Sequence, residues 1–300
     1  MPVNESPFLQ EPLVEIVSGT KARPADLANR VTNADDPQWG VAQAFFIWVT
    51  SVVLLIIVPG LAVVPYVIYR ALVFGSQQSQ PLLADKNFIF LSILAVLPTH
   101  LLSLLLVWFV VTNSGRRPFW QSLGWSWPAN FGPGKSVLLA SALLGVGLLI
   151  TRVFGGGETQ LDHLINSSYG ARVATAFLAV ATGPLVEELI YRGVLYSALQ
   201  RAIGMLWAVV VVSVLFAGVH VFQYYNNFAV IAVITMLSVA LTLIRALTGR
   251  LLPSFIVHLI FNGIQSLFLV LQPFFQNFIQ SGPQKPAISF LFHSLARHFG

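Results

Sequence analysis

Long apolar runs separated by short polar segments dominate this 300-residue chain. A transmembrane helix needs about 20 predominantly apolar residues, and a window of about 19 residues is suited to finding such runs. The pattern predicts an all-α, polytopic membrane bundle of about seven to eight transmembrane helices. The predicted spans cover residues 42–74, 88–112, 136–154, 172–199, 205–222, 228–247 and 251–271, with a weaker apolar stretch within 274–299.

The first run is longer than one span requires. It is interrupted by Pro59, Gly60 and Pro65. Proline removes a helical hydrogen bond and bends or ends a helix, so this run is predicted to be either one long kinked helix or a tight pair.

Composition supports the membrane assignment, since 56% of the residues are hydrophobic, 9% are charged and the mean hydropathy is +0.78, whereas soluble domains are about 25% charged. We expect an integral, multi-pass protein, in the plasma or inner membrane if the source is prokaryotic. The net charge of +5 is scattered between apolar runs, which favours contacts with the lipid bilayer and no nucleic acid. The chain has no cysteine, so disulfides, thiolate metal ligands and a cysteine nucleophile are excluded.

The chain shows no internal repeat and no boundary between two folded domains. We expect a polar N-terminal tail over residues 1–40 and one membrane domain over residues 41–300. The connection 155–170 carries Glu158, Asp162 and His163 among turn residues and is predicted to be a solvated loop.

Three charged residues, Glu187, Glu188 and Arg192, lie inside one of the predicted spans. An ionised side chain at that depth costs about 2.5–3.5 kcal/mol on insertion scales. Glu188 and Arg192 are four residues apart and share a helix face, so they can form an ion pair. Glu187 is rotated by about 100° and has no partner within its helix. This unpaired carboxylate is the starting point for a functional hypothesis.

Two further polar pairs interrupt apolar spans downstream. Phe216 and His220 are four residues apart, as are His258 and Asn262, so each pair shares a helix face. Taken singly, His220 or Asn262 can be an interhelical hydrogen-bond partner. Taken together with the charges upstream, these side chains are most easily hidden from lipid by facing one cavity. The remaining membrane histidine, His100, is predicted to be a packing residue beside Pro98.

The residue types point to hydrolysis of an acyl bond. A carboxylate and an imidazole that converge on one water make a general base pair, and an imidazole with a carboxamide can hydrogen-bond a developing oxyanion. Glu187 suits the base, whereas Glu188 paired with Arg192 would hold the helix in place. Other hydrolase signatures, the HExxH zinc motif and the GxSxG elbow, do not occur.

Pro184 precedes the charged turn. It lacks a backbone donor and therefore leaves a carbonyl unpaired about one turn upstream. At membrane depth this is tolerable only beside protein or a hydrated cavity, so Pro184 indirectly supports a cavity here.

The three motifs, EExxxR at 187–192, FxxxH at 216–220 and HxxxN at 258–262, resemble those of the CPBP family, which includes CAAX prenyl endopeptidases of the Rce type and Abi proteins. The resemblance covers residues 171–272. It implies an intramembrane protease in which Glu187 and His220 activate water, while His258 and Asn262 stabilise the oxyanion. It also implies supporting roles for Glu188, Arg192 and Phe216. The implied substrate is a peptide or protein, lipidated or not.

Alternatives to this hypothesis follow from the same residues. Glu187, His220 and His258 could bind Zn²⁺ with one open position, although Asn262 is a poor zinc ligand and no cofactor is favoured. A non-catalytic scaffold or immunity factor of the same fold could use the cavity to hold a partner. An ion-coupled transporter is disfavoured, since the other spans lack acids and no repeat is visible.

Overall fold

The computed structural model describes residues 34, 36–75 and 81–281 of the chain. These residues contain helices and no strand, and seven helical stretches are long and apolar enough to cross a membrane. The all-α prediction is confirmed, and the protein is an integral, multi-pass membrane protein. Of the weaker apolar stretch within 274–299, residues up to 281 continue the last helix and the remainder lies outside the described residues.

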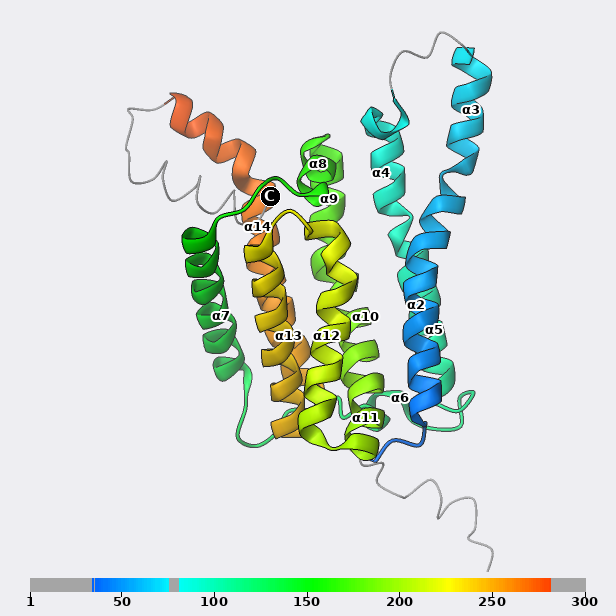
Figure 1. The fold of residues 1–300 in the computed structure, drawn as a ribbon, viewed down its shortest axis with the longest axis vertical. Helices are drawn as coiled ribbons and strands as arrows, with labels where there is room; N and C mark the ends of the chain where they lie inside the picture. The colour runs from blue at the N-terminus through cyan, green and yellow to red at the C-terminus, as the bar shows by residue number, and fades with distance from the viewer. Residues whose placement is uncertain (1–33, 35, 76–80, 282–300) are drawn as a thin grey trace, which may run out of the picture. The chain divides into compact units, whose positions relative to one another are not determined.

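Figure 1 shows the order of the elements along the chain. The spans are Val41–Phe74, Lys86–Val111, Pro133–Phe154, Tyr169–Ile203, Met205–Tyr224, Phe228–Thr248 and Leu252–Phe275. The helices within and between them are α2 (Val41–Ala62), α3 (Val64–Phe74), α4 (Lys86–Leu94), α5 (Val96–Val111), α6 (Phe119–Ser122), α7 (Pro133–Phe154), α8 (Gln160–Asn166), α9 (Tyr169–Phe177), α10 (Gly183–Glu187), α11 (Tyr196–Ile203), α12 (Met205–Tyr224), α13 (Phe228–Thr248) and α14 (Leu252–Ser281), with short turns at η2 (Leu82–Ala84), η3 (Leu178–Thr182) and η4 (Glu188–Leu195).

The first apolar run is one long helix with a break, not a tight pair. Helix α2 contains Pro59, and α3 starts directly after Val63. The Val63 N–H donates to the Pro59 carbonyl at 3.2 Å, so helical hydrogen bonding continues into the break. The two helices therefore form a single kinked span.

The span Tyr169–Ile203 contains two π-helical stretches, η3 and η4, on either side of α10. In η3 the Gly183 N–H donates to the carbonyl of Leu178, five residues earlier. All eight residues of η4 are buried. π-helical turns are rare and occur often at functional sites. The charged segment is thus the most irregular and the most enclosed helix of the bundle.

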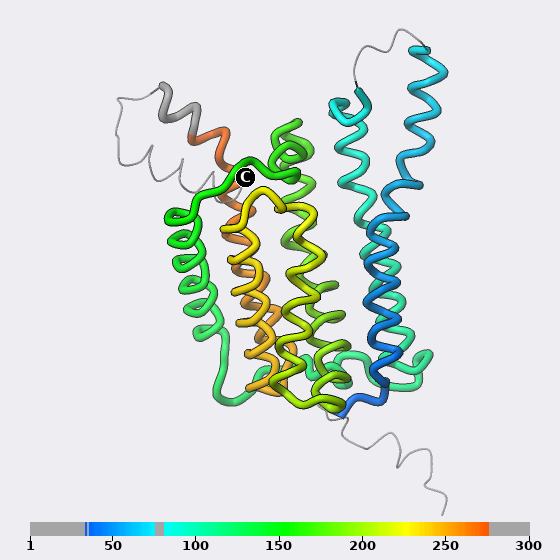
Figure 2. Tube along the Cα trace, viewed as in Figure 1, coloured from blue at the N-terminus to red at the C-terminus, as the bar shows by residue number. Residues whose placement is uncertain are grey.

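Helix α12 packs against α11 and α13, and α14 packs against α7, α10 and α13. Helix α2 runs along α5 and contacts η4, which joins this pair to the charged segment. Figure 2 follows the same path as a single tube. One core cluster surrounds η4 and includes Leu189, Leu195 and Phe216. The core thus forms around the helix that carries the charges.

Most of the predicted tail lies outside the described residues, and its boundary at residue 40 stays a prediction. Its last residues nevertheless pack on the bundle. The Trp39 indole N–H donates to the Val194 carbonyl at 3.1 Å, and Arg201 donates to the Pro37 carbonyl at 2.6 Å. The described part of the chain falls within one compact unit that begins at Thr32.

The prediction of a solvated loop over residues 155–170 is confirmed for residues 155–158, which are exposed and non-helical, and is wrong for the segment that follows. Residues Gln160–Asn166 form α8, and Thr159 and Asp162 are buried. The Asp162 carboxylate accepts from both the backbone N–H and the hydroxyl of Thr159, and the Thr159 hydroxyl accepts from the Asp162 N–H. This capping box satisfies polar groups that we expected water to satisfy.

Candidate active site

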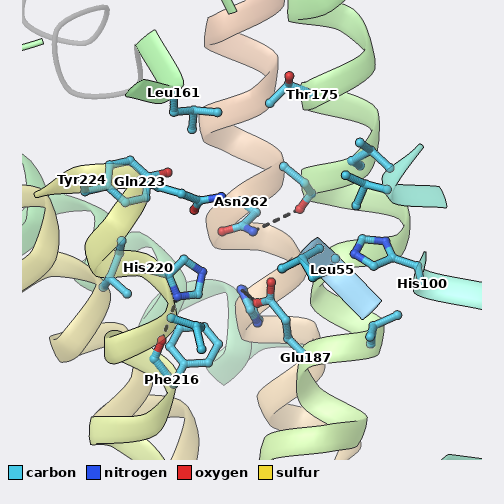
Figure 3. Close-up of a pocket in the computed structure, with 18 of the residues that line it drawn as sticks. Leu55, His100, Leu161, Thr175, Glu187, Phe216, His220, Gln223, Tyr224 and Asn262 are labelled. Atoms are coloured by element: carbon cyan, nitrogen blue, oxygen red, sulfur yellow. Dashed lines mark hydrogen bonds and ion pairs between the residues drawn. The ribbon is translucent and has the colours of Figure 1, made fainter. Parts of the chain in front are cut away.

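A cavity of about 540 Å³ opens between the helices. Glu187 of α10, His220 of α12, and His258 and Asn262 of α14 all line it. Figure 3 shows Glu187, His220 and Asn262 directed toward a common space. The structure therefore brings together four side chains that are spread over 76 positions of the sequence, from 187 to 262.

Beneath the cavity, Glu188 and Arg192 form the ion pair that their spacing predicts. Both are fully buried, and Arg192 Nη1 lies 2.9 Å from Glu188 Oε1. The guanidinium also donates to Ser238 Oγ at 2.8 Å, to the Ser238 carbonyl at 3.1 Å and to Thr242 Oγ1 at 3.2 Å. Ser238 and Thr242 were missed from the sequence. In the sequence, these two residues could have been found as a pair of hydroxyl side chains four positions apart on one face of an apolar span.

Phe216 lies between the buried ion pair and the cavity. The guanidinium carbon of Arg192 is 4.6 Å from the centroid of its ring, and the centroid of the His220 ring is 4.7 Å away on its own helix. A cation over an aromatic face is stabilised by the ring quadrupole. Phe216 thus covers Arg192 and supports the imidazole of His220.

His258 lies between the two adjacent glutamates. Its Nδ1 is 3.0 Å from Glu188 Oε1, and its Nε2 is 3.7 Å from Glu187 Oε2. A carboxylate only accepts hydrogen bonds, so Nδ1 carries the hydrogen toward Glu188. Arg192, Glu188, His258 and Glu187 therefore form a continuous chain from the core to the cavity. We expected His258 to act beside Asn262, and the structure also connects it to the supporting ion pair.

The two glutamates differ sharply in exposure. The side chain of Glu187 is 30% exposed, whereas that of Glu188 is fully buried. The buried carboxylate has Arg192 and His258 as partners, and the accessible one faces the cavity. Of the two, Glu187 is thus the one placed to meet a substrate.

The ring orientation of His220 is set by a backbone bond. Its Nδ1 lies 2.8 Å from the carbonyl oxygen of Phe216. A carbonyl cannot donate, so Nδ1 carries the hydrogen and Nε2 of the neutral ring is an acceptor. Nε2 has no hydrogen-bond partner among the residues that the structure describes. This nitrogen is therefore available to take a proton from water in the cavity.

The carbonyl that Pro184 leaves unpaired can be identified. The Gly183 N–H donates to the carbonyl five residues earlier, at Leu178, and the same register would pair the N–H of residue 184 with the Ala179 carbonyl. Because residue 184 is proline and has no N–H, the Ala179 carbonyl lacks this backbone donor. Asn262 Nδ2 donates to this carbonyl at 3.0 Å (Figure 3). Asn262 thus joins α14 to η3, and one of its two amide hydrogens remains for the cavity.

The interpretation of His100 as a packing residue is wrong, because it lines the cavity from α5. Its Nδ1 is 2.7 Å from the hydroxyl of Thr182 in η3. The sequence signal was present, a histidine inside an apolar span beside Pro98, but its partner is 82 positions away. Other polar cavity residues lie outside the motifs and include Ser51, Thr99, Ser103, Thr159, Thr175, Tyr191, Gln223, Tyr224 and Gln265.

The zinc alternative requires three protein ligands around one open position. Among the described residues, no three histidine, aspartate or glutamate side chains are arranged to hold a metal ion. The hydrogen bond from His258 Nδ1 to Glu188, which is itself paired with Arg192, leaves Nε2 as the ring nitrogen that could bind a metal. Zinc binding by Glu187, His220 and His258 stays an alternative hypothesis.

A comparison with protein families gives a match over the same part of the chain. Residues 169–264 match the family model described as Type II CAAX prenyl endopeptidase Rce1-like. The membrane-embedded CAAX protease MroQ of Staphylococcus aureus (strain USA300) is 27% identical over 157 residues. That alignment covers 46% of this chain and 61% of the relative. No solved structure matches. The range matched by the family model contains every residue of the three motifs.

Proposed function

We propose that this chain is an intramembrane endopeptidase of the CAAX-protease type, in keeping with the match of residues 169–264 to the Rce1-like family model. The site would hydrolyse a peptide bond in the cavity between α10, α12 and α14. One observation carries this proposal: Glu187, His220, His258 and Asn262 line the same cavity of about 540 Å³.

The attacking water would lie between the Glu187 carboxylate and His220 Nε2. Both atoms accept hydrogen bonds, so both can orient the water, and Glu187 takes one of its protons as the oxygen adds to the peptide carbonyl carbon. The C–N bond then breaks, and the proton held by Glu187 passes to the leaving nitrogen. The products are a carboxylic acid, which then ionises in water, and an amine.

The carbonyl oxygen becomes negatively charged in this step and needs donors. Asn262 would supply the amide hydrogen that Ala179 does not use. His258 would donate from Nε2 in its imidazolium form, in which Nδ1 keeps its hydrogen bond to Glu188. Donors fixed in advance stabilise such an oxyanion without reorganisation, which is often the largest catalytic contribution. The ion pair of Glu188 and Arg192 would hold His258 in place.

The substrate class follows from the surroundings of the site. Spans of the bundle enclose the cavity, and apolar side chains such as Leu55, Leu161 and Val233 line it beside the polar groups. We propose a peptide or protein substrate whose cleaved bond lies near a membrane-embedded or lipidated segment. The proposed reaction requires no metal or other cofactor.

A cleavage assay tests this proposal. The purified protein in liposomes would be given an internally quenched decapeptide ending in a farnesylated CAAX sequence, and the same peptide without farnesyl. Glu187→Gln and His220→Ala should each lower kcat about 10²- to 10⁴-fold, because each removes a proton acceptor. Glu158→Gln, which changes an exposed glutamate outside the cavity, is the matched control and should not change kcat.

Two outcomes would contradict the mechanism. Cleavage that persists in Glu187→Gln would remove Glu187 from the role of base. Loss of wild-type cleavage with a chelator, together with one equivalent of bound metal, would favour the zinc alternative.

A further inference from the structure

Two histidines lie on either side of Glu187. Figure 3 shows His220 of α12 on one side and His100 of α5 on the other. Both line the cavity. His100 lies outside the three motifs and outside the range 169–264 matched by the family model. The proposed mechanism gives it no task.

The hydroxyl of Thr182 differs from those of other threonines in these helices. Its backbone neighbour one turn upstream, the Leu178 carbonyl, already accepts from the Gly183 N–H. Thr182 Oγ1 has only His100 Nδ1, at 2.7 Å, as a hydrogen-bond partner among the described residues. Several other threonine hydroxyls donate to the carbonyl four residues earlier, as in Thr112, Thr151, Thr235, Thr242 and Thr248.

This contact sets the tautomer of His100. The Thr182 hydroxyl has no other acceptor among the described residues, so we assign its hydrogen to His100 Nδ1, which places the hydrogen of the neutral ring on Nε2. Nε2 has no hydrogen-bond partner in the described part of the chain. His220 has the opposite arrangement, with its hydrogen on Nδ1. One ring therefore presents an acceptor to the cavity and the other a donor.

The other donors on the wall that carries His100 are hydroxyls, such as those of Ser103 on α5 and Ser51 on α2. Thr99, its neighbour on α5, is bonded to the Ala95 carbonyl at 3.3 Å and to the Leu54 carbonyl at 3.5 Å. Trp48 donates to the Tyr191 hydroxyl at 3.0 Å. A peptide in this cavity has backbone carbonyls that must be paired, since an unpaired buried carbonyl costs about 1–3 kcal/mol.

We infer that His100 is a substrate-binding residue, which donates from Nε2 to a backbone carbonyl oxygen of the peptide on the side of Glu187 away from His220. This inference rests on the proposed function and extends it to a residue of the N-terminal half. Thr182 is the positioning residue, because its hydroxyl selects the donor tautomer. The role is ground-state alignment of the peptide, so it concerns KM more than kcat.

The kinetic test uses variants that separate shape from hydrogen bonding. His100→Phe keeps a ring and removes the donor, and it should raise KM for the farnesylated decapeptide about tenfold with kcat changed less than about threefold. His100→Gln can still donate and should restore most of the affinity. Thr182→Val removes the hydroxyl that selects the His100 tautomer and should raise KM less than His100→Phe does. Thr182→Ser keeps the hydroxyl and should leave KM unchanged.

A binding assay makes the test independent of turnover. In Glu187→Gln protein, the fluorescein-labelled decapeptide should bind about tenfold more weakly when His100→Phe is added. His163→Phe, on an exposed histidine of α8, is the matched control and should leave binding unchanged. Equal binding with and without His100→Phe would overturn the inference, and so would a hundredfold fall in kcat at constant KM. If the wild type cleaves neither peptide the proposed function fails, while the binding result still decides the role of His100.

Discussion

The first span and the charged span differ in how much of each is buried within the protein. In the most apolar window of Val41–Phe74, 17% of the residues are buried within the protein, compared with 50% in Tyr169–Ile203. The first span exposes large apolar side chains such as Ile56 and Leu72, which suit lipid. The charged span is enclosed by its neighbours and carries two π-helical stretches.

The difference shows what a buried charge requires in a membrane. Arg192 has partners from its own helix and from α13, and Phe216 of α12 covers it. A lipid-facing helix needs only apolar side chains and its own backbone bonds. A helix that carries ions needs fixed neighbours on every side, and this enclosure also creates the cavity wall. Substitutions should therefore have large effects in the charged span and small ones in the first half.

The largest effect on stability is expected at the buried ion pair. Arg192→Ala leaves the Glu188 carboxylate without its cationic partner and should lower the free energy of unfolding by about 3–5 kcal/mol. Thermal unfolding in one detergent would measure this, with the exposed Arg116→Ala as control. Adding Glu188→Ala should cost less than the sum of the two single changes, because the residues interact directly. Additive losses would contradict the pairing.

A smaller effect is expected where Asn262 holds the π-helical turn. Asn262→Ala leaves the Ala179 carbonyl unpaired and should lower stability by about 1–3 kcal/mol. Pro184→Ala restores an N–H for that carbonyl, so Asn262→Ala should cost less stability in this background. The loss of kcat should remain in both backgrounds if Asn262 also contacts the oxyanion. If both stability and kcat recover in the Pro184→Ala background, the role of Asn262 is structural only.

The smallest effect is expected in the first half, at Asp85. Burial raises the pKa of Asp85, but hydrogen bonds from Tyr66 and from two backbone N–H groups, with the charge of Arg70, bring it below its ordinary value. Arg70 Nη1 lies 3.0 Å from Asp85 Oδ2. Asp85→Asn keeps the side-chain acceptor for the start of α4 and should cost about 1 kcal/mol at pH 7.

The pH dependence of this contribution has a definite sign. A lowered pKa in the folded protein stabilises it fully above the unfolded pKa of about 3.9, and the contribution disappears as pH falls through the folded pKa. The difference in melting temperature between wild type and Asp85→Asn should therefore shrink between pH 5 and pH 2. A difference that grows on acidification would contradict the Asp85 assignment.

The sequence by itself determined the spans and the chemistry-bearing residues. Lipid requires about 20 apolar residues for each crossing, so the helices could be placed within a few residues. The pairing of Glu188 with Arg192 depends only on the pitch of one helix and was also predictable. The unpaired carbonyl near Pro184 followed from the chemistry of proline.

Only the tertiary structure decided which helices are neighbours and how each is rotated. That is why Ser238 was not recognised as a partner of Arg192, and why His100 was taken for a packing residue. The burial of Asp162 in α8 was missed for a local reason, since its carboxylate accepts hydrogen bonds from a cap that composition does not reveal. An apolar face looks the same whether it meets lipid or another helix, so the contacts that assemble the cavity are fixed by packing between segments far apart in the chain.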